Sequence, residues 1–69
     1  MNKKNLTVEK TFALAQKNHK KNNFKVAENL YKEILKTHPN NFQTLYLLGS
    51  LSLQIKNFEQ AKQLFDKAL

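Results

Sequence analysis

An offset of 34 residues maps much of this chain onto itself. At that offset the identical pairs are Leu14/Leu48, Asn23/Asn57, Phe24/Phe58, Ala27/Ala61, Leu30/Leu64 and Leu35/Leu69. Conservative pairs lie among them: Phe12/Tyr46, Ala15/Gly49 and Tyr31/Phe65. A fixed period of this length is typical of a solenoid, in which each unit buries its apolar face only by stacking on the next. The period therefore predicts two stacked copies of one small unit.

Apolar spacing and turn signals predict four helices, one pair in each copy. Their expected ranges are about Val8–Lys21, Phe24–Thr37, Phe42–Ile55 and Phe58–Leu69. The third has apolar residues on more than one face, so we expect it to lie between neighbours. Short connections make sequential helices antiparallel neighbours, which predicts an all-α fold of two helical hairpins.

The expected helix ends rest on residues with known capping chemistry. Thr7 is the predicted N-cap of the first helix, and Asn22-Asn23 ends that helix and caps the second. Pro39 stops the second helix because it biases the preceding residue out of helical geometry. Asn40 or Asn41 then caps the third helix, and Lys56-Asn57 makes the next turn. Two surface pairs, Glu28 with Lys32 and Glu59 with Lys62, are expected along the helices.

Composition excludes several classes of function. The 69 residues contain no cysteine, which excludes disulfides, thiolate metal sites and thiol nucleophiles. His19 and His38 are too few and too far apart in sequence to suggest a zinc site. No apolar run approaches the roughly 20 residues of a membrane span, and the basic N-terminus lacks the apolar core of a secretory signal. We therefore expect a soluble, cytoplasmic protein without metal or cofactor.

The net charge of +7 raises the question of nucleic-acid binding. Every basic residue is lysine, so the guanidinium fork that reads guanine edges is missing. Seven lysines crowd the first 25 residues, opposed there only by Glu9: Lys3, Lys4, Lys10, Lys17, Lys20, Lys21 and Lys25. This pattern favours a solvated lysine-rich surface, and a basic nucleic-acid-binding module is the weaker alternative.

Motifs at the same register resemble the tetratricopeptide repeat. The stretch from His38 to Gly49 is similar to the junction and first helix of that family, and Asn57–Ala61 with Phe65 and Ala68 resembles its second helix. The residues that would carry the repeat are Leu14, Ala15, Phe24, Ala27, Tyr31, Pro39, Leu48, Gly49, Phe58, Ala61, Phe65 and Ala68. The resemblance implies a first repeat with its inter-repeat turn at 7–41 and a second, truncated repeat at 42–69. Residues 1–6 are polar, and we expect a flexible N-terminus there. Thr11, Leu45, Asn18 and Ser52 depart from the family's usual aromatic residues.

The resemblance also implies a function: binding a protein or peptide on the concave helix surface. By carry-over, Glu9, Phe12, Gln16, His19 and Lys20 would line that groove from the first repeat. Gln43, Tyr46, Ser50, Leu53 and Gln54 would continue it from the second. Two alternatives stay open: Phe12 and Tyr46 could merely cover neighbouring helices, and His19 could be a solvated or capping side chain. The other aromatic residues are expected in the core.

No residues form a catalytic constellation, so we expect no enzymatic activity in this chain. Its five acids are scattered over helix faces and offer no paired general acid and base. The chain could instead be the docking region of a larger repeat protein fused to a transferase. The last helix has an apolar face that the third helix alone cannot cover, so self-association through this helix is also expected.

Overall fold

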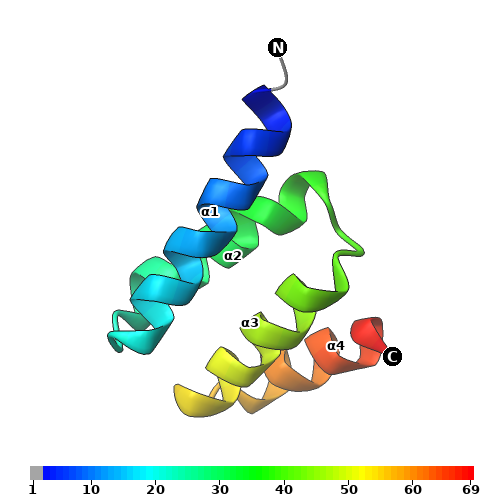
Figure 1. Cartoon of the computed structure of the whole chain (residues 1–69). Helices are drawn as coiled ribbons and strands as arrows, with labels where there is room; N and C mark the ends of the chain where they lie inside the picture. The colour runs from blue at the N-terminus through cyan, green and yellow to red at the C-terminus, as the bar shows by residue number, and fades with distance from the viewer. Residues whose placement is uncertain (1–2) are drawn as a thin grey trace.

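The computed structural model describes residues 3–69, with side chains from Val8 onward. Four helices follow one another: α1 (Lys3–Lys20), α2 (Phe24–Thr37), α3 (Phe42–Gln54) and α4 (Phe58–Ala68). Each helix packs against the next in chain order, which gives one hairpin of α1 with α2 and a second of α3 with α4 (Figure 1). The predicted all-α architecture of two stacked hairpins is confirmed, and α3 lies between α2 and α4 as expected.

The start of α1 differs from the prediction. The helix begins at Lys3, so Thr7 lies inside it and is not its N-cap. The predicted flexible segment 1–6 falls partly on Met1 and Asn2, which lie outside the described residues, while 3–6 belong to the helix. A threonine is only one possible start signal. The preceding residues include no proline or glycine, and lysine and leucine propagate a helix well.

Both hairpins close with the same backbone geometry. Asn22 and Lys56, 34 residues apart, each have a φ of 66°. In each turn the amide of the following asparagine donates to a carbonyl near the end of the helix, Asn23 to Asn18 O and Asn57 to Ser52 O, both at 2.8 Å. Asparagine tolerates this left-handed conformation, whereas lysine adopts it at some cost. The sequence repeat thus extends to individual main-chain hydrogen bonds.

The predicted cap at Asn41 is confirmed, and Asn57, predicted only as part of a turn, caps α4 as well. Asn41 Oδ1 accepts from the Thr44 amide at 2.9 Å, and Asn57 Oδ1 accepts from the Gln60 amide at 3.2 Å. Asn23 occupies the predicted N-cap position of α2, but its side chain makes no capping hydrogen bond. The side-chain nitrogen Nδ2 of Asn23 donates to Asn18 Oδ1, at 3.1 Å.

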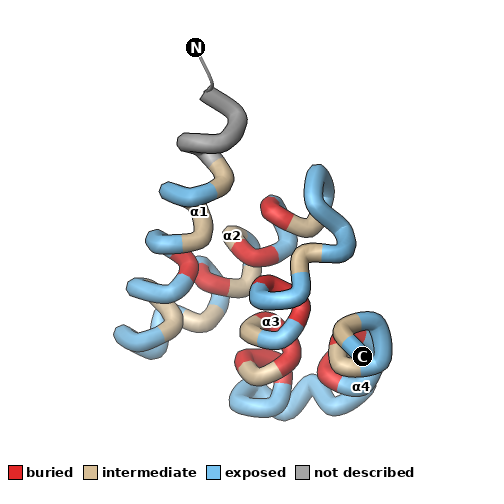
Figure 2. The backbone as a smooth tube through the Cα atoms, turned by 45° about the vertical axis from the view of Figure 1, so that its right-hand side comes forward, coloured by how far each residue is buried: buried red, intermediate tan, exposed pale blue. Residues whose placement is uncertain are grey.

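The core lies along α2 and α3, whose buried residues face the other helices (Figure 2). Its buried members are Ala15, Ala27, Tyr31, Leu45, Leu48, Leu51 and Leu64. Ala27 and Ala61, at equivalent positions on α2 and α4, are both buried and allow close helix approach. Gly49 has a similar role, because a Cβ there would lie only 2.8 Å from Cε1 of Phe65. The equivalent Ala15 fits beside α2 with no solvent exposure.

Equivalent residues of the two repeats are not equally buried, which corrects several predictions. Leu48 is 1% exposed, whereas its counterpart Leu14 is 50% exposed. Leu48 belongs to the core that α2 shares with α3, and no described helix precedes α1 to cover Leu14. The aromatic repeat had suggested that Phe42 and Phe58 are core residues. Both are instead largely exposed. Burial depends on whether a neighbouring helix covers the residue, and the residue type alone does not indicate whether such a helix is present.

A polar network connects α2, α3 and α4. Gln60 Nε2 donates to Ser52 Oγ at 2.8 Å and to Glu28 Oε2 at 3.1 Å. Ser52 is buried, and its hydroxyl donates to Leu48 O at 2.7 Å. The predicted Glu28–Lys32 pair is present at 3.4 Å, but the Glu28 side chain is only 12% exposed and is no ordinary surface group.

The predicted pair of Glu59 with Lys62 is wrong. Lys62 Nζ instead lies 3.1 Å from Asp66 Oδ2, one turn further along α4. Spacings of three and four residues both bring side chains together on a helix, so the sequence alone does not choose between the two acids. Glu59 is exposed in the first turn of α4, where a carboxylate suits the positive helix end.

We predict that Leu48→Ala destabilises the fold much more than Leu14→Ala, although the two leucines are repeat equivalents. Removing the buried side chain should cost about 2–5 kcal/mol, because it leaves a cavity. The half-exposed leucine should cost about 1 kcal/mol or less. Urea denaturation followed by circular dichroism measures both. Equal losses would contradict the packing of α2 on α3.

We predict a loss of stability in acid that depends on Glu28. The hydrogen bond from Gln60 lowers the pKa of this carboxyl below its ordinary value of 4.5, and the charge of Lys32 adds to it. The folded state therefore resists protonation. The stability that the ionised Glu28 carboxylate contributes is fully present above pH 4.5. It is lost as the pH falls through the lower pKa that this group has in the folded state.

Urea denaturation between neutral pH and acid should show this loss in the wild-type chain. Glu28→Gln should reduce the pH dependence, because glutamine does not titrate. Gln60→Ala should reduce it as well, by removing the hydrogen bond that lowers the pKa. Identical pH profiles for all three chains would show that Glu28 is not responsible.

Candidate functional site

Two adjoining hollows lie between α1 and α3. The first, of about 330 Å³, is lined by Gln16, His19, Lys20, Asn22, Tyr31, Leu47 and Gln54. The second, of about 220 Å³, is lined by Phe12, Gln16, Phe42, Gln43, Tyr46 and Leu47. Because Gln16 and Leu47 line both, the two hollows form one continuous depression, here called the α1–α3 groove.

Most of the predicted groove residues do lie in this depression. They are Phe12, Gln16, His19 and Lys20 on α1, and Gln43, Tyr46 and Gln54 on α3. Glu9, Ser50 and Leu53 line neither hollow. Leu53 lies seven residues after Tyr46, and this spacing places it on the side of α3 that bears Phe42 and Tyr46.

Four lining residues were not predicted: Asn22, Tyr31, Phe42 and Leu47. Helical spacing could have identified Leu47, which lies four residues after Gln43 and seven before Gln54 and so shares their face. Tyr31 could not be found this way, because it belongs to α2 and not to either of the two helices that form the sides of the groove. Its hydroxyl takes part in the most specific contact of the site.

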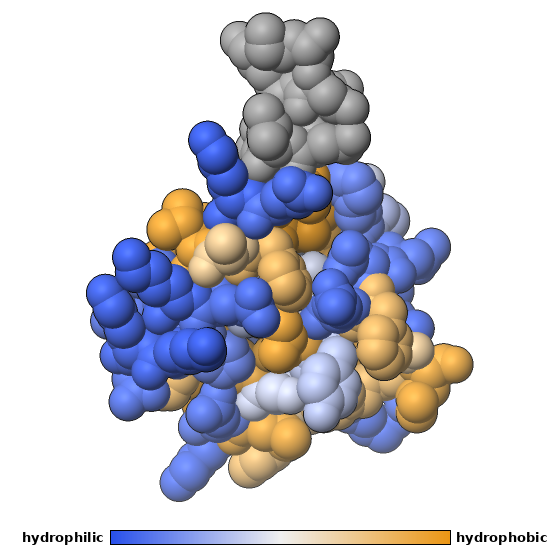
Figure 3. Space-filling view, in the orientation of Figure 1, coloured by the Kyte–Doolittle hydropathy of each residue, from blue (hydrophilic) through white to orange (hydrophobic). Residues whose placement is uncertain are grey.

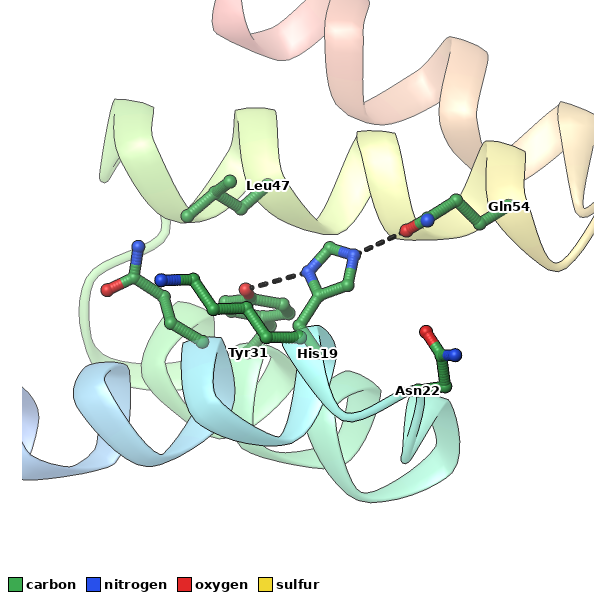
Figure 4. Close-up of a pocket in the computed structure, with 7 residues that line it drawn as sticks. His19, Asn22, Tyr31, Leu47 and Gln54 are labelled. Atoms are coloured by element: carbon green, nitrogen blue, oxygen red, sulfur yellow. Dashed lines mark hydrogen bonds between the residues drawn. The ribbon is translucent and has the colours of Figure 1, made fainter.

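His19 connects three helices through hydrogen bonds. Its Nδ1 lies 3.1 Å from the Tyr31 hydroxyl, and its Nε2 is hydrogen-bonded to Gln54 Oε1 (Figure 4). A carboxamide oxygen only accepts, so Nε2 carries the proton that is donated to Gln54. In the neutral ring, Nδ1 then accepts from the Tyr31 hydroxyl. We call this Tyr31–His19–Gln54 chain the clasp.

Burial of Tyr31 supports the direction of the clasp. The side chain is fully buried, and burial raises the pKa of its phenol above the ordinary value of 10.0. The hydroxyl therefore keeps its proton at neutral pH and is available as a donor. The histidine is neither solvated nor a simple cap: it also packs edge-on against Tyr31 and Phe24, with ring centroids 5.9 and 6.0 Å apart.

The two ends of the groove differ in chemistry. The clasp closes the end nearest the α1–α2 turn, where Lys20 and Asn22 add polar groups. Aromatic rings form the other end: Phe12 packs edge-on against Tyr31 at 6.3 Å, and Phe42 stacks on Tyr46 at 6.2 Å. Phe42 and Tyr46 are both more than half exposed. The groove thus offers amides and a cation at one end and accessible aromatic surface at the other.

Other kinds of site are not found among the residues that the structure describes. No group of three or more histidine or acidic side chains converges there in a way that could hold a metal ion. Within the same part of the chain, no helix has the length and apolar character needed to cross a membrane.

We predict that His19→Leu alone costs about 1–3 kcal/mol of stability, because it leaves the buried Tyr31 hydroxyl without a partner. Leucine and phenylalanine occupy the equivalent positions 53 and 65 of the second repeat. The double variant His19→Leu/Tyr31→Phe should therefore recover most of the loss. Chemical denaturation of the wild type, both single variants and the double variant measures the coupling. Additive losses would contradict the clasp.

The comparison with known families agrees with this geometry. The profile of the tetratricopeptide repeat family matches residues 13–69, which span the greater part of the chain and all of α2, α3 and α4. Neither a curated protein nor a solved structure matches the chain. The matched range includes both hairpin turns and the later part of α1. The chain belongs to the tetratricopeptide repeat family.

Proposed function

We propose that this chain is a protein-interaction scaffold that holds a peptide segment of its partner in the α1–α3 groove. Tetratricopeptide repeats generally mediate protein–protein interactions. The observation that carries the proposal is the polarity of the groove, in which the clasp lies at one end and exposed aromatic rings at the other. We also propose that the chain acts by binding alone, in the cytoplasm.

The chemistry of the lining suits an extended peptide. Gln16 and Gln43 are exposed on facing helices, and each carboxamide can donate to and accept from a peptide backbone. Phe42 and Tyr46 offer an apolar side chain of the peptide a large contact area. Lys20 at the clasp end favours a carboxylate there. The bound segment is therefore apolar at the Phe42 end and acidic at the Lys20 end.

The charge of the chain supports the same class of partner. The chain has twelve lysines and only five acidic residues. Three of those acids already pair with lysines of the same helix. The surplus of positive charge attracts an acidic segment over a distance of about 8 Å at physiological salt. The hollows, of about 330 and 220 Å³, accommodate single peptide side chains better than a large cofactor.

We predict that peptides selected from a random display library against the 69-residue chain depend on Gln16 and Gln43. Gln16→Ala and Gln43→Ala should each weaken binding about fivefold through loss of a hydrogen bond. Gln63→Ala is the matched control, because Gln63 lies on α4 and lines neither hollow of the groove. Fluorescence anisotropy with a labelled selected peptide measures the three affinities.

Two results would contradict this proposal. A loss with Gln63→Ala but not with the groove variants would place the binding surface outside the groove. Tight binding of a DNA duplex, with an affinity that falls steeply with salt at a log–log slope of about −0.9 per contacted phosphate, would favour the nucleic-acid alternative. A peptide complex should be far less sensitive to salt.

A further inference from the structure

The side of the molecule formed by α3 and α4 carries exposed apolar side chains, two of which, Phe42 and Tyr46, also line the α1–α3 groove. This surface consists of Phe42, Tyr46 and Leu53 on α3 with Phe58, Phe65 and Leu69 at α4, and we call it the tail face. Phe58 is 62% exposed and Leu69 is fully exposed, while Phe65 is the least exposed of the six. The rings of Tyr46 and Phe65, 5.9 Å apart, join the two helices across this face. Surfaces of this kind mark interaction sites.

The repeat itself shows that this surface is built to be covered. The counterparts of the tail face, 34 residues earlier, are Val8, Phe12, His19, Phe24, Tyr31 and Leu35. None of these is exposed, because they lie in the first hairpin, which α3 packs against. The same six positions in the second repeat have no helix over them among the described residues. The tail face therefore has the character of a stacking surface, and no other described helix covers it.

The charge distribution favours a second copy of this chain as that occupant. The described lysines are concentrated on α1, α2 and the turn between them, whereas α4 balances Glu59 and Asp66 against Lys62 and Lys67. In Figure 3, hydrophilic atoms gather on the left over the end of α1, and a group of hydrophobic atoms lies at the right over the end of α4. Two chains with a net charge of +7 repel each other least when their α4 ends meet.

The other end of the molecule is unsuited to the same contact. On α1, Lys10 and Lys17 occupy the positions of Thr44 and Leu51, which are fully buried in the second repeat. If α1 of one copy took the place of a stacking helix on another copy, these ammonium groups would lose hydration. Leu14 is the large apolar residue exposed between them. The two lysines thus oppose head-to-tail stacking of copies.

We propose that this chain forms a symmetric dimer in which the tail faces of two copies pack together about a twofold axis. Such an interface is self-complementary and closes after two copies. If two antiparallel α4 helices meet at a point midway between Lys62 and Asp66, Lys62 of each copy lies opposite Asp66 of the other. These two residues now pair within one helix, at 3.1 Å. The dimer covers the apolar surface, including Phe42 and Tyr46 at the aromatic end of the groove, so a second copy and a bound peptide compete for these two rings. The lysine-rich ends stay apart.

Sedimentation velocity on the full 69-residue chain tests the proposal. Between about 1 μM and 1 mM, the range in which weak dimers dissociate, the wild type should pass from monomer to dimer and form nothing larger. Phe58→Gln and Leu69→Gln should each raise the dimer Kd about 100-fold, because each substitution removes two apolar contacts per dimer. Leu14→Gln is the matched control on the opposite end, and it should leave the Kd unchanged.

Circular dichroism establishes whether each variant is folded. The Leu69→Gln variant is the decisive one, because a fully exposed side chain can be replaced without disturbing the core. A monomer at all concentrations would overturn the proposal, and a different occupant would then cover the tail face. Growth beyond dimers would overturn it in favour of head-to-tail stacking. In that case Leu14→Gln would also block association, and an equimolar mixture of Leu14→Gln and Leu69→Gln would form heterodimers although neither variant associates alone.

Discussion

The packing of α2 against both α1 and α3 holds this small molecule together. A chain of this length buries only about 60% of the surface of its unfolded state, so no helix can be spared from the core. α2 contributes Ala27, Tyr31 and Ile34, all of which are buried. It serves as the second helix of one hairpin and as the platform on which the other hairpin rests. The groove depends on the same helix, because Tyr31 forms its floor.

Two polar connections fix how the second hairpin sits on the first. The clasp joins α1 and α2 to α3, and the Glu28–Gln60–Ser52 network joins α2 to α3 and α4. Apolar contacts alone would tolerate small rotations between the hairpins, whereas hydrogen bonds weaken steeply away from their preferred geometry. The width of the groove, and with it the size of the side chain that it admits, is therefore defined by a few polar residues.

The local features of the fold were predictable because they depend on neighbouring residues. The bounds of α2 agree with the prediction at both ends, since an asparagine pair precedes Phe24 and a proline follows Thr37 closely. The period, the hairpins and the caps at Asn41 and Asn57 follow from signals of the same kind. The start of α1 was missed because lysine-rich segments propagate a helix without any special start signal.

Features that depend on distant residues were not predictable. His19 and Gln54 are 35 residues apart, and nothing in either local pattern indicates that they meet. Leu14 and Leu48 are identical and equivalent, yet their burial differs because α3 packs on the helix before it, whereas no described helix precedes α1. Seven of the ten predicted groove residues do line the hollows, because the helical period places them on the same sides of α1 and α3. Whether they bind a partner remains a prediction.

The packing of each helix mainly on its neighbours in sequence has a consequence for folding kinetics. Each helix packs mainly on the one before it and the one after it, so most contacts join residues that are close in sequence. Chains with such low contact order fold within microseconds to milliseconds. The outer helices α1 and α4 each pack extensively on one helix and can open separately, whereas α2 and α3 each pack on two. Amide hydrogen exchange will therefore be slowest in the middle of the chain, and the groove between α1 and α3 will open from its α1 side first.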